Sequence, residues 1–512
     1  MTDGFVSNRR QLFGTAGRSF VAGLIAKLPA LGAPKAEPGI YQRIGVRPII
    51  NCKGTFTIIS GSQSLPEVKK ALEEASRHYV HLDELMDGVG RRLAELTKAE
   101  WGIITAGCAA AATHATAACI AGANPEKMQR LPKLTGLKHE VVMPAQSRNV
   151  YDHAIRMTGV TMITPKTREE FLAALGPHTA MVAILGEELT HHPMPLKEMT
   201  EAAHKRGIPV FVDAAAERLT IPNVYLGAGA DMVAYSGGKC LRGPQCAGVL
   251  LGKKDLLQAA WINSAPHHAF GRSLKVGKEE IMGMLAAVEA WTHRDHDAEW
   301  KQWEGWLGTI REKVSAVPTV RTEVLQPDGP SNYAPQLRVS WDTEKVGITG
   351  TALADALLSG DPRIIIPAGH DSLTIMPYMM MPGDDKIVAP RLYELMSKPP
   401  HQPKPAAAGS AAQVSGQWDV EIAYNRDHAV HTFYFEQKGD QLMGSHRGEF
   451  LTGDIRGKVE GSHVRCRSNH HYEGTSIGYT FEGVAEGDNM RGTVNVGEYG
   501  KAPFTARRHF HA

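Results

Sequence analysis

The spacing of hydrophobic and polar positions changes along this 512-residue chain. In the middle of the chain, short uninterrupted apolar runs alternate with stretches whose apolar residues recur at helical spacing. Such runs are typical of strands buried on both faces, which lack the in-and-out alternation of half-exposed strands. They lie at residues 180–185, 208–212, 232–235 and 247–251.

The stretches between and after these runs predict helices. Residues 196–206 carry apolar side chains at helical spacing and end at Gly207, a usual C-cap. A strand, a helix and a strand in this order imply right-handed crossovers and a mainly parallel sheet. A long helix over 279–291 leads into a shorter segment of mixed elements. We therefore expect a large α/β domain over 41–300 and a smaller α+β domain over 301–397.

The last fifth of the chain has a different pattern. Residues 398–415 form a Pro/Ala-rich linker without periodicity. Beyond it, apolar residues alternate with polar ones in short runs that are separated by Gly/Asp turns. This predicts a small antiparallel barrel or sandwich over 416–512. The module is rich in histidine, but no finger-type ligand spacing occurs in it, so we predict no metal site there.

Residues 1–36 form a leader of another kind. Residues 7–13 read SNRRQLF and precede a mildly apolar stretch and several small alanines. This resembles a bacterial twin-arginine (Tat) export signal, which predicts a periplasmic or exported protein. The alternative is a basic N-terminal tail on a cytoplasmic protein.

Composition narrows the classes of function. Lys and Arg total 56 against 54 Asp and Glu, so the formal net charge of +2 gives no basic field for nucleic acid. No uncharged apolar run is long enough for a membrane span. The six cysteines include no CxxC pair, so neither a disulfide scaffold nor a zinc ribbon is indicated.

The most specific chemistry lies at the ends of two predicted strands. Lys239 follows Ser236, Gly237 and Gly238 at the end of one strand, where α/β sheets bind their ligands. A partly desolvated amine there can form a Schiff base with an aldehyde cofactor. The alternative is a solvated loop lysine.

Asp213 ends the preceding strand. A buried carboxylate requires a cationic partner, and the protonated nitrogen of a pyridine ring is one. An Asp followed by a Lys on the next strand is the order expected in pyridoxal-phosphate enzymes of the aspartate-aminotransferase fold. The alternative for Asp213 is a helix N-cap.

Upstream, Gly107, Cys108 and Ala109 open an alanine-rich helix. Small residues at a helix N-terminus let a phosphate approach the free N–H groups, and the helix dipole favours the anion. Ser236 could add a hydroxyl to the same site.

Several separated blocks then carry a family resemblance, at residues 41–57, 81–122, 211–217 and 235–248, the last reading YSGGKCLRGPQCAG. They resemble the bacterial selenocysteine-synthase-like family of pyridoxal-phosphate enzymes, which includes D-glucosaminate-6-phosphate ammonia-lyase. The resemblance spans roughly 41–397. It implies an aspartate-aminotransferase-like fold (fold type I), with pyridoxal 5'-phosphate held by Lys239 and its pyridine nitrogen facing Asp213. Gly107, Cys108, Ala109 and Ser236 would hold the phosphate.

The resemblance implies further roles with looser support. Residues 271–278 also match, which places Arg272 and Lys275 in an active site shared between two subunits of a homodimer or higher oligomer. His153 is our first choice for the ring that stacks on the cofactor, and Tyr151 is the second. Arg363 could bind a substrate carboxylate through two hydrogen bonds, or it could be a solvent-facing structural arginine.

The resemblance favours a lyase acting on a small amino acid or amino-sugar acid. Removal of the Cα proton and β-elimination would release ammonia and a 2-keto acid. Selenium transferase-like β-replacement, transamination, racemisation and an inactive exported binding protein remain alternatives. The near-neutral charge and the export-like leader weigh against a tRNA substrate.

Overall fold

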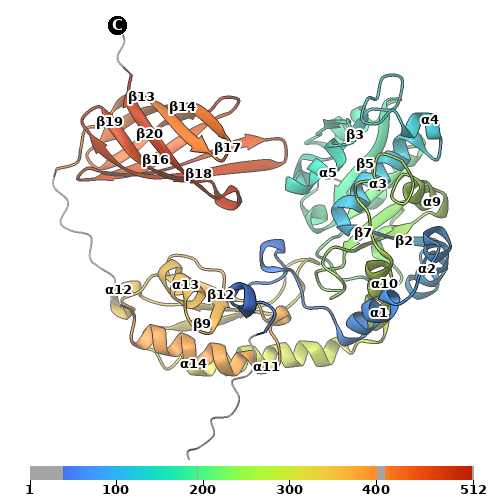
Figure 1. Ribbon diagram of the computed structural model, residues 1–512, viewed down its shortest axis with the longest axis horizontal. Coiled ribbons are helices and arrows are strands. Elements are labelled where there is room, and N and C mark those ends of the chain that lie inside the picture. The colour runs from blue at the N-terminus through green and yellow to red at the C-terminus, as the bar shows by residue number, and fades with distance from the viewer. Residues whose placement is uncertain (1–38, 193, 401–409, 510–512) are drawn as a thin grey trace, which may run out of the picture. The chain divides into compact units, whose positions relative to one another are not determined.

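The computed structural model describes residues 39–192, 194–400 and 410–509 (Figure 1). The chain divides into a short unit ending at Pro48 and a large unit, Ile49–Ala512. The export-like leader predicted over 1–36 lies outside the described residues, as does half of the predicted linker. The described part of the short unit contains one 3-10 helix, η1 (Gln42–Ile44).

The large unit contains a seven-stranded sheet with helices packed around it (Figure 1). Every neighbouring pair is parallel except those made by β8, which runs antiparallel to both β2 and β7. This confirms the mainly parallel sheet, and the four predicted apolar runs are β5 to β8. In spatial order the strands are β2 (Trp101–Thr105), β8 (Gly248–Gly252), β7 (Met232–Ser236), β6 (Val210–Asp213), β5 (Thr179–Leu185), β3 (Glu140–Val142) and β4 (Thr161–Ile163).

Helices pack on this sheet around one core. The helix α3 (Gly107–Ala121) is buried on nearly every side, because its alanines let β-strands and neighbouring helices approach closely. The two helices predicted at 196–206 and 279–291 are α7 and α10. The helices of this part are α1 (Pro66–Ser76), α2 (Leu82–Thr97), α4 (Pro125–Met128), α5 (His153–Arg156), α6 (Arg168–Ala174), α7 (Leu196–His204), α8 (Val224–Gly227), α9 (Lys254–Ile262) and α10 (Lys278–His293).

A second core belongs to the smaller α+β part. It starts at α11 (His296–Val314) and holds a three-stranded antiparallel sheet in the order β12–β10–β9. Its elements are β9 (Arg321–Leu325), β10 (Gln336–Ser340), α12 (Thr343–Val346), α13 (Gly350–Ser359), β11 (Arg363–Ile365), β12 (Ser372–Ile375) and α14 (Asp384–Ser397).

One strand of this smaller part comes from the far end of the chain. The strand β1 (Ile49–Asn51) pairs in parallel with β11, with Ile49 opposite Arg363 and Asn51 opposite Ile365. The sequence predicted that residues 41–300 form the large domain. The β1 strand lies in the N-terminal arm that was predicted within that range, and it pairs with β11 of the smaller part. Its short sequence, Ile-Ile-Asn, gave no sign of this distant partner.

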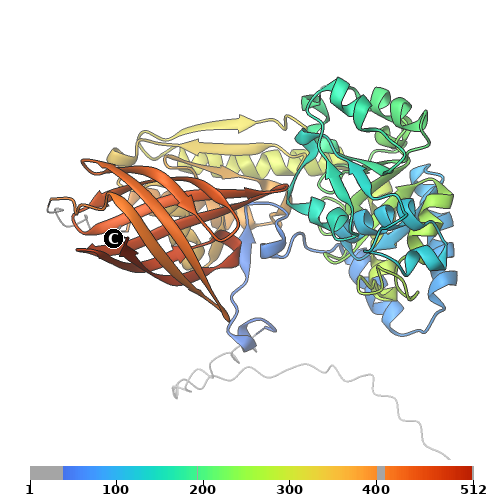
Figure 2. The same ribbon diagram turned by 90° about the horizontal axis from the view of Figure 1, so that it is seen from above.

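The C-terminal module is a closed eight-stranded antiparallel barrel (Figure 2). The predicted barrel is therefore confirmed over the sandwich. Alternate residues face a core that includes Trp418, Phe433 and Phe481, as the period of two requires. The strands are β13 (Gly416–Tyr424), β14 (Asp427–Lys438), β15 (Gln441–Arg447), β16 (Thr452–Glu460), β17 (His463–Tyr472), β18 (Thr475–Glu486), β19 (Asn489–Asn495) and β20 (Lys501–Arg508). In the part of the chain that the structure describes, no helix has the length and apolar character needed to cross a membrane.

Candidate active site

Lys239 leaves β7 in a loop whose backbone is fixed by close packing. The Gly237 N–H donates to the Ala247 carbonyl at 2.8 Å, and the Gly238 carbonyl accepts from the Ser62 N–H at 2.9 Å. A Cβ on Gly237 would lie 2.7 Å from the Ala247 oxygen, and one on Gly238 would lie 2.7 Å from the Gln245 Cα. Both positions therefore require glycine, and the pair sets the direction in which Lys239 leaves the sheet.

Asp213 lies at the end of β6, the strand beside β7, and it is opposite Ala234 in the parallel register. Its Oδ1 accepts a hydrogen bond from the Ala215 N–H at 3.0 Å and one from the Cys108 thiol at 3.3 Å. Burial raises the pKa of Asp213, whereas these two hydrogen bonds and the charge of Lys239 lower it. A cationic ring nitrogen would complete the hydrogen bonding of this carboxylate.

The Cys108 side chain has a role that the sequence did not predict. Burial raises the pKa of this thiol well above its usual value, and the neighbouring Asp213 carboxylate raises it further. Cys108 is therefore a protonated donor that orients Asp213. Only its backbone N–H remains for the predicted contact with phosphate.

That N–H belongs to the start of α3, which the first residue of β8 approaches closely. Gly107 has φ +86°, and a Cβ on Gly248 would lie 2.6 Å from the Gly107 carbonyl carbon and 2.8 Å from the Cys108 nitrogen. Ser236 is opposite Gly248 in the β7–β8 register, so its side chain belongs to the same edge of the sheet. The 15-residue helix α3 offers unpaired N–H groups and the positive end of its dipole to an anion there.

An amine, a buried carboxylate and a helix N-terminus thus meet at one edge of the sheet. These groups match the aldehyde, the ring nitrogen and the phosphate of pyridoxal 5'-phosphate, so the residues present fit that cofactor.

Tyr151, rather than His153, is the ring that approaches Lys239. The Lys239 Nζ lies 5.9 Å from the centre of the Tyr151 ring, although the side chains of Tyr151 and His153 are both exposed. The adjacent Asp152 is 2% exposed and accepts hydrogen bonds from Arg148 at 2.6 Å and from Arg156 at 2.9 Å. These ion pairs hold the segment that presents Tyr151, so the geometry favours the second of the two predicted rings.

Glu217 is a buried acid that the sequence analysis missed. It is 2% exposed, and its Oε2 accepts a hydrogen bond from the Tyr225 hydroxyl. Its Oε1 is buried and has no hydrogen-bond partner among the residues that the structure describes. Burial, followed by the charges of Glu187 and Asp213, raises the pKa of Glu217 to about 7, although the Tyr225 hydrogen bond opposes the shift. The signal was a second acid, four residues after Asp213, beyond the same strand.

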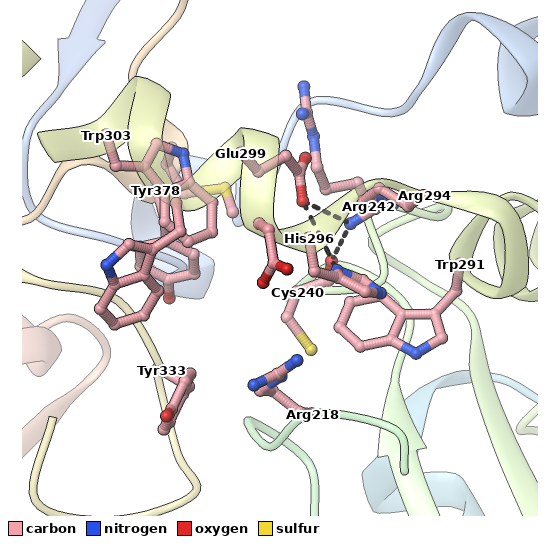
Figure 3. A pocket seen from close by; sticks show the side chains of 13 residues that line it. Arg218, Cys240, Arg242, Trp291, Arg294, His296, Glu299, Trp303, Tyr333 and Tyr378 are labelled. Atoms are coloured by element: carbon pink, nitrogen blue, oxygen red, sulfur yellow. Dashed lines mark hydrogen bonds and ion pairs between the residues drawn. The ribbon is translucent and has the colours of Figure 1, made fainter. Parts of the chain in front are cut away.

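A cavity of about 300 Å³ adjoins the lysine loop through Cys240 (Figure 3). We call it the arginine cleft. Its walls are mainly aromatic, because tryptophans from α10 and α11 meet tyrosines of the smaller part of the chain. The residues that define it are Arg218, Arg242, Arg294, Trp291, Trp300, Trp303, Tyr333 and Tyr378, together with Cys240, His296, Asp297, Glu299 and Met379.

The three guanidinium groups of the arginine cleft are held in different ways. Arg294 donates to the Cys240 carbonyl at 3.1 Å and lies 3.8 Å from a Glu299 carboxylate oxygen. Arg218 lies over the Tyr333 ring, 4.8 Å from its centre. Burial lowers the pKa of Arg242, and the charge of Arg294 lowers it further. An anionic group in the cleft would relieve this accumulation of positive charge.

The remaining predicted residues lie elsewhere. Arg363 begins β11, where its Nε donates to the Leu358 carbonyl at 2.9 Å, and it does not line the arginine cleft. Its role as a carboxylate-binding residue stays a prediction. Arg272 and Lys275 are exposed between α9 and α10, so their predicted contact with a second subunit also stays a prediction.

Comparisons with known proteins agree with this geometry. The aminotransferase class-V family matches residues 74–271. The chain is 28% identical over 374 residues to 5'-C-glycyluridine monooxygenase-decarboxylase of a Streptomyces species, covering 70% of this chain and 92% of the relative. It is 27% identical over 376 residues to D-glucosaminate-6-phosphate ammonia lyase of Salmonella typhimurium, covering 70% and 98%.

Two further comparisons extend this picture. An L-seryl-tRNA(Sec) selenium transferase of Rhizobium meliloti is 26% identical over 362 residues, covering 64% of this chain and 73% of that protein. The solved structure of a D-glucosaminate-6-phosphate ammonia-lyase superimposes with a TM-score of 0.63 at 25% identity, covering 70% of this chain and 98% of that one.

The fold is therefore that of the fold-type-I pyridoxal-phosphate enzymes, and the relatives imply pyridoxal 5'-phosphate as the cofactor. Within that class, the comparisons confirm the predicted likeness to the group that holds D-glucosaminate-6-phosphate ammonia-lyase and the bacterial selenium transferases.

Proposed function

We propose that the protein is a pyridoxal-phosphate-dependent lyase that takes an anionic amino acid or amino-sugar acid. Loss of a Cα proton and of a β-hydroxyl group, followed by hydrolysis of the released enamine, would give ammonia and a 2-keto acid. The observation that carries the proposal is the convergence of Lys239, Asp213 and the N-terminus of α3 at the ends of adjacent strands.

The residues of the chain would divide the work as follows. The cofactor supplies an electron sink that stabilises negative charge at the substrate Cα. The Lys239 amine removes and returns the Cα proton, because it leaves the sheet beside the bound ring. Asp213, oriented by the Cys108 thiol, holds the proton on the ring nitrogen.

The arginine cleft would bind the substrate's anionic groups. The Arg242 Nε donates to the Gln63 carbonyl and Arg218 lies over the Tyr333 ring, so both guanidinium groups retain donors for an ion pair with a substrate anion. The aromatic walls exclude water from the reacting atoms, which strengthens these contacts.

The test is a substrate screen with the purified full chain loaded with pyridoxal 5'-phosphate. D- and L-β-hydroxy amino acids and amino-sugar acids are assayed for ammonia and 2-keto acid. We expect turnover that Lys239→Ala abolishes and that Lys205→Ala, an exposed lysine at the end of α7, leaves unchanged. Equal release of both products by the wild type and Lys239→Ala would overturn the proposal.

A second candidate is oxygen-dependent decarboxylation. A relative of similar identity is named as a monooxygenase-decarboxylase, and a pyridine ring held by Lys239 and Asp213 would supply the electron sink that loss of carbon dioxide from a substrate requires. In that reaction one oxygen atom of O2 enters an amide product and the other leaves as water. Stoichiometric oxygen consumption with carbon dioxide release, and no ammonia, would select this candidate over the lyase.

We also propose that the leader exports the folded protein through the Tat pathway and that the active enzyme is a homodimer or a higher homo-oligomer. The twin arginines and the cationic segment around Arg272 and Lys275 support these proposals. Unchanged localisation of an Arg9→Lys, Arg10→Lys variant would contradict export. A monomeric mass by light scattering with full activity would contradict the shared site.

A further inference from the structure

The barrel interior contains a polar cluster where its pattern calls for apolar side chains. His431 on β14, His446 on β15 and His470 on β17 occupy inward positions, and each is at most 5% exposed. His446 is opposite Phe433 in the ladder, so imidazole and apolar core meet directly. A buried polar group is costly unless its hydrogen bonds are satisfied.

The hydrogen bonds of this cluster are incomplete. His431 Nδ1 lies 2.8 Å from His446 Nε2, and His470 Nε2 donates to the His446 carbonyl at 3.0 Å. His446 Nδ1 is buried and finds no hydrogen-bond partner in the part of the chain that the structure describes. The cluster therefore exceeds what the barrel needs for its own packing.

Two glycines make room for these rings. A Cβ on Gly453, on the strand between His446 and His470, would lie 2.9 Å from the His470 ring. A Cβ on Gly448 would lie 3.2 Å from the His470 ring and 3.5 Å from the His431 ring. The His446 and His470 rings consequently approach to 4.3 Å between centres.

A cavity of about 360 Å³ opens beside the cluster. We call it the histidine chamber. His431 and His470 form its inner end, the rings of Tyr424 and Tyr479 line its wall, and the carboxylates of Asp427 and Glu449 lie at its rim. Its volume suits a small organic molecule, and eight-stranded barrels can enclose one.

The charge of the histidine chamber selects the kind of ligand. Burial lowers the pKa of His431 to about 4 and of His446 to about 2, so these imidazoles are neutral near pH 7. No lysine or arginine among the described residues lines the chamber. An anion would meet only carboxylates and neutral rings, whereas a cation would meet carboxylates and the negative faces of aromatic rings.

A bound metal ion is a poorer fit. Among residues 39–192, 194–400 and 410–509, no group of three histidine, cysteine or acidic side chains is arranged to hold one. We propose that the histidine chamber binds a small organic cation with an apolar body. Its cationic group contacts the aromatic rings and the rim carboxylates, and its body extends along the wall.

The test uses benzyltrimethylammonium, whose quaternary nitrogen cannot react with the aldehyde of the cofactor. Titration calorimetry on the full-length holoenzyme is compared with titrations of phenylacetate and benzyl alcohol, and the histidine ring signals are followed by NMR. We expect a Kd of about 0.1–1 mM for the cation, shifts of the buried histidine signals, and binding of phenylacetate at least tenfold weaker.

Two variants localise the binding. Glu449→Gln changes an exposed rim carboxylate and is expected to weaken the cation about 3- to 5-fold, and His431→Leu about tenfold. Glu421→Gln, an exposed carboxylate on β13 outside the chamber, is the matched control. The proposal is overturned by absence of binding, by equal affinity for phenylacetate, or by equal effects of Glu449→Gln and Glu421→Gln.

Discussion

The arginine cleft and the histidine chamber are of similar size and both have aromatic walls, yet their charges are opposite. The cleft combines aromatic rings with three guanidinium groups, which outnumber its two carboxylates, those of Asp297 and Glu299. The chamber combines them with neutral imidazoles and two carboxylates. Aromatic walls alone would not distinguish their ligands. The ionisable groups do, because they decide whether an anion or a cation is stabilised.

Lys239→Ala is expected to have the largest effect, and this effect should be limited to enzymatic turnover. Because the variant lacks the amine that anchors the cofactor and moves the Cα proton, we expect turnover to fall at least 10³-fold. The visible absorbance of the holoenzyme should shift as well. Binding of benzyltrimethylammonium to the chamber should not change, and a parallel loss of that binding would show that the two cavities are not independent.

Arg242→Gln tests the charge of the arginine cleft. Removing a guanidinium group from a desolvated anion site costs about 2–5 kcal/mol. We therefore expect kcat/KM for an anionic substrate to fall about 100-fold, mainly through KM, with little change for an uncharged analogue. Arg321→Gln, an exposed arginine on β9, serves as the control. Equal losses for charged and uncharged substrates would indicate damage to the fold.

Glu217 makes the stability of the part of the chain that holds the seven-stranded sheet fall as pH rises. Its pKa is raised to about 7 in the folded chain from a usual value of 4.5, so the unfolded state loses this proton first as pH rises. Stability is thus lost between pH 4.5 and about 7, by about 2 kcal/mol. The free energy of unfolding is measured by hydrogen exchange of the amides in β5 and β6. We expect Glu217→Gln to be more stable than the wild type at pH 8 but not at pH 4.5. A constant difference would contradict the assignment.

The barrel should respond to pH in the opposite direction, with a smaller effect. The pKa of His431 is lowered to about 4 from 6.5, so the unfolded chain binds this proton first as pH falls. Stability is lost between pH 6.5 and about 4, by about 1–2 kcal/mol after allowance for solvent near the chamber. Hydrogen exchange of the amides in β14 and β15 at pH 7 and pH 5 measures this loss in the free energy of unfolding. In His431→Leu, the free energy of unfolding should depend less on pH than in the wild type. An unchanged dependence on pH would refute the prediction.

Local patterns predicted the features that depend on neighbours in sequence. The positions of β5 to β8, Lys239 and Asp213 follow from short apolar runs and the residues that end them. Tyr151 was placed second because the sequence cannot show that Asp152, held by Arg148 and Arg156, presents the tyrosine ring.

Features assembled from distant segments were not predicted. Arg218, Trp300 and Tyr333 of the arginine cleft are far apart in sequence, and each alone is an ordinary side chain. The histidine chamber was likewise not predicted, because a period of two shows which residues face inward but not that histidines from β14, β15 and β17 meet inside the barrel. The predicted absence of a metal site rested on ligand spacing along the chain.

The pairing of β1 with β11 imposes an order on biosynthesis. Ile49–Asn51 leaves the ribosome early, but its partner Arg363–Ile365 follows about 300 residues later. Until then, the three residues of β1 have no strand partner, while the sheet that carries Asp213 and Lys239 is already complete in the chain. The smaller part can therefore complete its fold only after the whole sheet that carries Asp213 and Lys239 has been synthesised.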